Sequence, residues 1–165
     1  MSQRRRIVCF LLGFGTAVGS FAAESPWIAS GGIGIVDQEA IGGALNASLG
    51  LERVLTPAIS LGVRAGYFAK DDCCGVSRDT LYLVAFGKAG VDLRALRVFA
   101  EVGGGSYSFI GERQRGWFGG IGLERRLKPR LSLSGAFRYH GVERPKGGPL
   151  PDFKQFELSL NWRAW

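Results

Sequence analysis

Few side chains in this 165-residue chain could carry acid–base or nucleophilic chemistry. His140 is the one histidine, the side chain that ordinarily changes its charge near neutral pH. A hydrolase that used it as a base would need a nucleophile beside it and an acid to orient it, and Glu157 could supply that acid. His140 is followed by Gly141 and Val142, so no serine nucleophile stands next to it. The pattern favours a histidine that is hydrogen-bonded to a neighbour, with catalysis as the alternative.

Cys73 and Cys74 are adjacent in a polar, turn-rich stretch. Adjacent cysteines do not easily form an unstrained bridge. They could form a strained disulfide, pair with another chain or remain free, and the acidic residues before them disfavour reactive thiolates. We interpret them as an oxidised cap of an external loop. One histidine and two such cysteines do not make a zinc site, so no metal and no cofactor are expected.

In several segments apolar and polar residues alternate, and charged residues of both signs recur at the polar positions. Alternate side chains of a strand lie on the same face of a sheet, so these charges should share one face. Buried charges cost several kcal/mol each unless they are paired, and both signs occur in similar number. We predict an interior salt-bridge network that plugs the fold, with a narrow or gated ion path as the alternative. The predicted network comprises Glu52, Arg64, Glu101, Glu124, Arg138, His140, Glu157 and Arg163.

The stretch 115–142 shows the alternation most clearly. Trp117, Ile121 and Leu123 share one face, while glycines and a glutamate fall on the other, and a similar run follows 127–130. Pro129 interrupts the pattern and predicts a tight turn between two antiparallel strands. One face of this hairpin is apolar and aromatic, and the other mixes glycine with single charges. An apolar exterior around a polar interior is typical of a transmembrane barrel.

The hairpin resembles the OmpA-type family of eight-stranded outer-membrane barrels, whose last hairpins often follow the pattern GxGLExRLxPxLSLxxxxRY. The matching residues are Gly120, Gly122, Leu123, Glu124, Arg126, Leu127, Pro129, Leu131, Ser132, Leu133, Arg138 and Tyr139. The resemblance implies an all-β, eight-stranded antiparallel up-and-down transmembrane β-barrel. It also implies a bacterial outer-membrane location and insertion by the barrel-assembly machinery.

Further alternating segments complete the eight expected strands. Beside the hairpin they cover 27–36, 41–52, 59–68, 80–91, 98–103 and 156–164, with a bulge or bend expected at the glycine run 103–105. Connections after the second, fourth and sixth strands should be short, and those after the third, fifth and seventh longer. Short turns of bacterial barrels face the periplasm, so both termini are expected there. The longer loops, expected at 69–79, 105–115 and 142–153, should face the exterior.

Residues 1–22 have the parts of a secretory signal peptide: a basic head, a short apolar run and a small-residue end. We expect 23–165 to be the barrel domain, with no appended periplasmic domain. Removal of three leader arginines lowers the basic residues from 21 to 18 against 14 acidic ones, and the net charge from +7 to +4. No remaining segment concentrates basic and aromatic residues, so nucleic-acid binding is not expected. A mild positive excess at the rim would suit outer-membrane lipid and lipopolysaccharide as partners.

Aromatic residues near the ends of the expected strands predict belts at the two membrane interfaces. They are Trp27, Tyr67, Trp117, Tyr139 and Trp162. Barrels of this type commonly end on an aromatic residue of the lipid-facing row. Trp165 falls on the opposite parity here, so either the last strand bulges at its end or Trp162 serves instead.

These observations predict a small outer-membrane barrel with a structural or surface-interaction role carried by its loops, and no enzyme. One rival is a lipid A modifying hydrolase, because outer-membrane lipid A deacylases are small barrels with a catalytic His-x-Ser and a Glu on the next strand. His140 and Glu157 resemble two members of that set, but the serine position holds Val142. A second rival is a soluble lipocalin-like barrel that binds a ligand, which requires an apolar interior.

Overall fold

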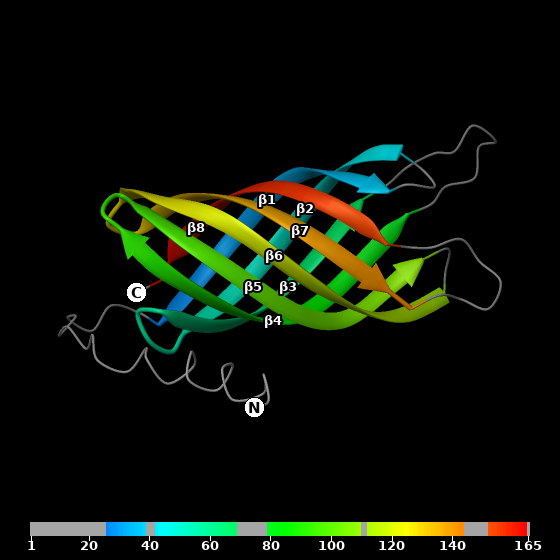
Figure 1. Cartoon of the computed structure of the whole chain (residues 1–165), viewed down its shortest axis with the longest axis horizontal. Coiled ribbons are helices and arrows are strands. Elements are labelled where there is room, and N and C mark those ends of the chain that lie inside the picture. Colours follow the sequence, from blue (N-terminus) through cyan, green and yellow to red (C-terminus); the bar gives the residue numbers. More distant parts are fainter. Residues whose placement is uncertain (1–25, 39–41, 69–78, 110–111, 144–151, 165) are drawn as a thin grey trace, which may run out of the picture.

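The computed structural model describes residues 26–38, 42–68, 79–109, 112–143 and 152–164, which form a closed antiparallel barrel (Figure 1). Each strand pairs with its neighbour in sequence, and the last strand pairs with the first. The strands are β1 Trp27–Gln38, β2 Gly42–Val54, β3 Ile59–Phe68, β4 Thr80–Leu93, β5 Leu96–Phe109, β6 Glu112–Lys128, β7 Leu131–Val142 and β8 Phe153–Arg163. The predicted eight-stranded all-β fold is therefore confirmed.

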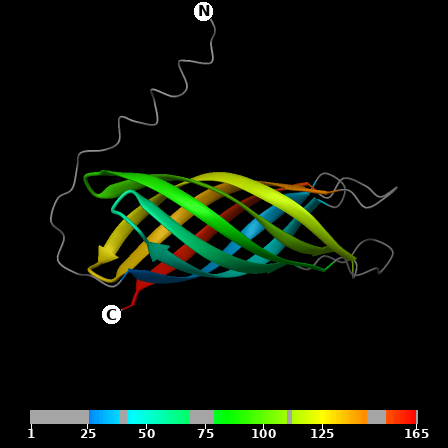
Figure 2. The same ribbon diagram turned by 90° about the horizontal axis from the view of Figure 1, so that it is seen from below.

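The two ends of the barrel differ in how the strands are joined. At one end, called here the turn end, the connections are 55–58, 94–95 and 129–130, and β1 begins and β8 ends there (Figure 1). The opposite end, called the loop end, carries the connections 39–41, 69–79, 110–111 and 143–152. Both views show strands that are strongly tilted to the long axis, as barrel closure requires (Figure 2). Among the residues described, no helix is long and apolar enough to cross a membrane.

Large apolar side chains are exposed around the whole outer surface. The largest exposed fractions are those of Leu45 at 80% and of Ile33 and Leu49 at 72%. Each strand contributes at least one such residue, as shown by Ile33, Leu45, Leu61, Leu83, Val102, Ile121, Phe137 and Leu158. Alternate residues of the same strands are buried inside, many of them polar or charged. The barrel is thus apolar outside and polar inside.

The predicted loop at 105–115 is wrong. β5 continues to Phe109 and β6 begins at Glu112, so the connection between them is no longer than a turn. The polar residues of 113–115 suggested a loop, but the ladder continues through them, with Arg115 opposite Ser106 and Arg113 opposite Ser108. The expected alternation of short and longer connections therefore fails after the fifth strand.

The glycine run at 103–105 forms no bulge. Gly103, Gly104 and Gly105 pair in unbroken register with residues of both β4 and β6. At Gly105 the β4 backbone lies where a Cβ would be, so the run allows close approach of two strands rather than a bend. The irregularity lies instead at 126–128, where the register between β6 and β7 shifts just before the Pro129 turn. That turn and the antiparallel hairpin were predicted.

Several predictions concern residues outside those described. They include the leader at 1–22, the loop 69–78 with Cys73 and Cys74, and the terminal Trp165. The expected loop at 142–153 also lies largely outside, but its two ends belong to strands: Val142 ends β7 and Phe153 begins β8.

Candidate functional site

A cluster of four buried charges lies at the middle of the barrel. Glu101 on β5 contacts two arginines from opposite walls: Arg64 on β3, 3.1 Å from Nη2 to Oε2, and Arg138 on β7, through Nε. Arg138 also reaches Glu157 on β8, with 3.0 Å between Nη1 and Oε1. Two positive and two negative charges therefore balance, and the contacts tie four strands together across the interior.

Neighbours satisfy both oxygens of Glu157, whereas Nη1 of Arg64 has no hydrogen-bond partner among the described residues. The Ser159 hydroxyl donates to one oxygen of Glu157 at 2.8 Å, and the Gln155 amide donates to the other at 2.9 Å. The Arg64 guanidinium lies over the ring of Phe86, 4.6 Å from its centroid. Because buried ion pairs are stable only when desolvation is offset by such additional bonds, the cluster is built to remain closed.

A second ion pair lies nearer the turn end. Lys88 on β4 contacts Glu52 on β2, with 2.5 Å between Nζ and Oε2, and the Ser60 hydroxyl donates to Oε1 of the same carboxylate at 2.6 Å. Lys88 was not among the predicted interior charges, because both faces of β4 are partly apolar and its register was left open. The alternation Tyr82, Val84, Phe86, Lys88 in the sequence was the signal that could have found it.

Glu124 and Arg163, also predicted to belong to the network, lie apart from the central cluster as Glu52 does. Glu124 is half-buried on β6 and accepts a hydrogen bond from the Ser132 hydroxyl at 2.5 Å. Arg163 is half-buried at the turn end of β8, six residues beyond Glu157 and opposite Ile28. The sequence prediction therefore grouped residues that the barrel separates into layers.

His140 lies in a layer of aromatic side chains on the loop-end side of the central cluster. Its ring stacks on Phe153 at 4.2 Å and on Phe118 at 5.3 Å between centroids. Nδ1 lies 2.9 Å from the Tyr107 hydroxyl, and Nε2 lies 2.9 Å from Oε1 of Gln155. His140 is only 1% exposed, so neither nitrogen faces solvent.

The partners of His140 determine its tautomer. The Gln155 amide nitrogen faces the carboxylate of Glu157, which can only accept, so the amide oxygen faces His140. Nε2 must then carry the proton that is donated to Gln155, and Nδ1 accepts from Tyr107. A polar chain thus runs from Tyr107 through His140 and Gln155 into the central cluster.

This arrangement does not support hydrolysis. The hydroxyl that His140 contacts belongs to a buried tyrosine, and Glu157 bonds to Arg138, Gln155 and Ser159 rather than to the histidine. A base, an acid and a nucleophile in mutual contact are what acyl transfer requires. Within the described strands no group of three His, Cys, Asp or Glu residues could hold a metal ion.

The five predicted belt residues are all exposed and lie in two sets. Trp27 and Trp162 lie near the turn end on adjacent strands, with Trp162 opposite Ala29. Tyr67, Trp117 and Tyr139 lie toward the loop end, and the rings of Trp117 and Tyr139 are 5.8 Å apart. An apolar zone flanked by aromatic residues at both ends matches the outer surface of a membrane barrel.

Comparison with known proteins adds the fold but no family. No family model matches the sequence, and no curated protein matches it. The solved structures that resemble it include Neisserial surface protein A (NspA), the N-terminal β-barrel domain of Pseudomonas aeruginosa OprF, and the outer membrane enzyme PagL. NspA has a TM-score of 0.68 at 10% identity and covers 87% of this chain and 100% of its own.

The OprF domain has a TM-score of 0.58 at 10% identity, covering 86% of this chain and 100% of its own. PagL has a TM-score of 0.53 at 17% identity, covering 83% and 99%. At such identities the likeness establishes the fold: a closed eight-stranded barrel of the kind found in the outer membrane.

Proposed function

We propose that the protein spans the bacterial outer membrane and serves a structural or surface-interaction role, without transport or catalysis. The observation that carries this proposal is the combination of an apolar outer face on all eight strands with an interior filled by paired charges and aromatic rings. A closed barrel satisfies its own backbone hydrogen bonds, so it can expose such a face only to lipid. Its interior blocks passage.

The partners that follow are outer-membrane lipid, lipopolysaccharide and, during insertion, the barrel-assembly machinery. The apolar outer rows support contact with acyl chains, and the two aromatic belts support interfaces at both ends. The loop end is the expected outer side, because the two longest connections, 69–79 and 143–152, lie there, whereas β1 begins and β8 ends at the opposite end. A surface partner would meet the protein there. Nucleic acid is not proposed.

A lipid A hydrolase remains the second candidate only through the likeness to PagL, named as an outer membrane enzyme. That likeness is one of fold, and NspA gives a higher TM-score. His140 has no serine partner and is buried. The soluble ligand-binding barrel is disfavoured because its interior would have to be apolar, whereas Glu52, Arg64 and Glu101 are buried inside this one.

The proposal is tested by heat-modifiability and conductance together. Outer membranes from cells that express the protein are fractionated, and unboiled and boiled samples are compared on a gel. We expect the protein in the outer-membrane fraction, with a migration shift that boiling abolishes. The purified barrel should give no discrete conductance steps in planar bilayers. A soluble periplasmic protein without a shift would overturn the membrane assignment, and defined channels would overturn the plugged interior.

A further inference from the structure

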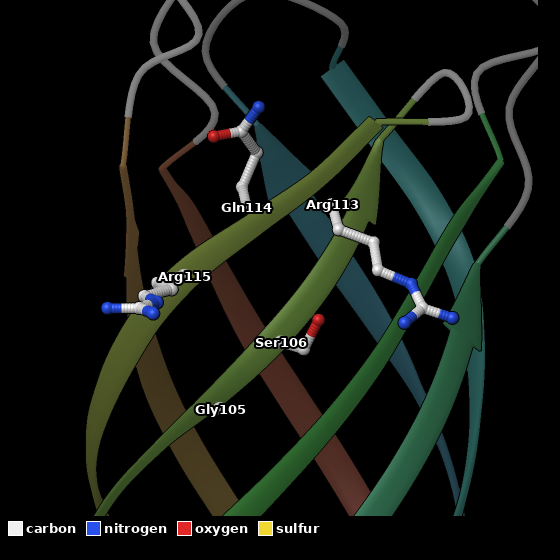
Figure 3. A pocket seen from close by; sticks show the side chains of 6 residues that line it. Gly105, Ser106, Arg113, Gln114 and Arg115 are labelled. Carbon is white, nitrogen blue, oxygen red and sulfur yellow. The ribbon is translucent and has the colours of Figure 1, made fainter.

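Two arginines face outward just beyond the loop-end aromatic belt. Arg113 and Arg115 lie on β6 at the same parity as Trp117, and their side chains are exposed. They border an open groove of about 560 Å³ on the β5–β6 hairpin. Figure 3 shows the two side chains extending to opposite sides of this hairpin, with Gly105 and Ser106 on the strand beside them.

The position of these arginines along the strand places them at the level of lipid headgroups. Arg115 and Arg113 follow Trp117 by two and four residues, which is about 7 and 13 Å along a strand that rises about 3.3 Å per residue. A strand tilt of about 40° reduces these to about 5 and 10 Å along the membrane normal. The headgroup layer on each side of a bilayer is about 5–8 Å thick. Since Trp117 marks the interface, the backbone of Arg115 lies within this layer and that of Arg113 about 2 Å or more beyond its outer edge.

Neither guanidinium is engaged by the rest of the described chain. Within the described strands, no hydrogen bond or ion pair involves either side chain. Their cross-strand neighbours on β5, Ser106 and Ser108, are small and carry no charge. Glu143, which follows β7, donates its backbone N–H to the Arg115 carbonyl at 2.8 Å, yet the two side chains form no ion pair.

We propose that this outward face of the β5–β6 hairpin binds the phosphate groups of anionic lipid headgroups through Arg113 and Arg115. The inference rests on the proposed membrane location and names the chemistry that this location supplies. Guanidinium groups bind phosphate with two parallel charge-assisted hydrogen bonds. The groove is open and lined by Gly105 and Ser106, so lipid headgroups can approach both arginines. Arg113 and Arg115 extend to opposite sides of the hairpin.

The chain provides a reporter beside this face. Among the described tryptophans, Trp117 is the one in the loop-end belt, and phenylalanine replaces the other three tryptophans of the chain, Trp27, Trp162 and Trp165, in all variants. The refolded protein is placed in phosphatidylcholine vesicles with an increasing share of phosphatidylglycerol, one lipid at a time carrying brominated acyl chains. Quenching of Trp117 then measures which lipid is enriched beside it.

We expect phosphatidylglycerol to be enriched near Trp117 by about fivefold or more, since a basic residue near an anionic surface contributes about that factor. The Arg113→Gln, Arg115→Gln double variant should lose the preference. Arg125→Gln is the matched control, because Arg125 is exposed on the same row of the same strand but at the turn end. This variant should keep the preference for phosphatidylglycerol. Glu143→Gln should strengthen the preference by removing the neighbouring acid.

The outcomes separate this inference from the proposed function. A barrel that shows the heat-dependent gel shift in vesicles but has equal quenching by both lipids refutes the headgroup site alone. An equal loss in Arg125→Gln would show a general effect of net charge and would also refute it. Inorganic phosphate that abolishes the preference at matched ionic strength, where chloride does not, would identify free phosphate rather than the headgroup as the ligand. Failure to insert at all refutes the proposed function.

Discussion

Replacement of Glu101 by glutamine is the sharpest test of the central cluster. Glu101 has no exposed side-chain area and bonds to both Arg64 and Arg138. Glutamine keeps the shape but removes the charge, so two arginines then share the single carboxylate of Glu157. Removal of one partner from a buried ion pair costs about 3–5 kcal/mol. Because glutamine still offers one acceptor oxygen, we expect a loss of about 3 kcal/mol in the free energy of unfolding.

The assay is urea unfolding of the barrel refolded in phospholipid vesicles, followed by tryptophan fluorescence and by loss of the fast-migrating gel form. Glu124→Gln is the control, since Glu124 is half-buried and bonds to one serine hydroxyl, so its effect should be much smaller.

Addition of Arg64→Gln to Glu101→Gln removes the excess positive charge and leaves the pair of Arg138 with Glu157. The double variant should therefore be less destabilised than the sum of the single ones, with a coupling free energy of about 1–3 kcal/mol. A loss below about 1 kcal/mol for Glu101→Gln, or strictly additive effects, would refute the view that these charges form one closed network.

Two further predictions concern the aromatic layer. A Cβ at Gly66 would overlap the ring of Tyr82, so Gly66→Ala should destabilise the barrel by about 1–3 kcal/mol, the usual cost of overpacking. Gly119→Ala, whose Cβ would meet nothing nearer than the Trp117 ring at 4.0 Å, should leave the urea midpoint unchanged, and equal effects would contradict the packing argument. Cells that express the wild-type protein or the His140→Gln variant should have the same lipid A acylation, measured by mass spectrometry, as cells without the protein. A loss of acyl chains that depends on His140 would instead support the hydrolase function.

The faces of the strands could be predicted from the sequence because alternation is a local property. β3 shows this best: its predicted bounds of 59–68 match those observed, with Val63 outside and Arg64 inside. The hairpin turn at Pro129 could be predicted for the same reason, because it depends on a local signal. The end of β5 and the beginning of β6 were not predicted. A polar stretch such as 113–115 has the same kind of sequence whether it forms a loop or continues the strand, as it does here.

The pairing of the interior charges could not be predicted. Arg64 and Glu101 are 37 residues apart in sequence, as are Glu101 and Arg138, and they meet only because barrel closure sets the height of each strand relative to the others. The alternation in the sequence indicated the face on which each charge lies, but not its position along the barrel axis. For the same reason Glu124 was grouped with residues that the barrel places in another layer.

The interior layers also hold the charged groups and the histidine of the barrel in place. Among the described residues, the buried carboxylates are held by basic side chains and hydrogen-bond donors, and His140 by a tyrosine, a glutamine and two stacked rings. A group held by such partners is costly to displace, because its desolvated neighbours would be left unpaired. By contrast, Arg113 and Arg115 on the outer face have no partner among the described residues. Among the described residues, these two open arginines therefore lie on the outside of the barrel, at the proposed boundary of the membrane.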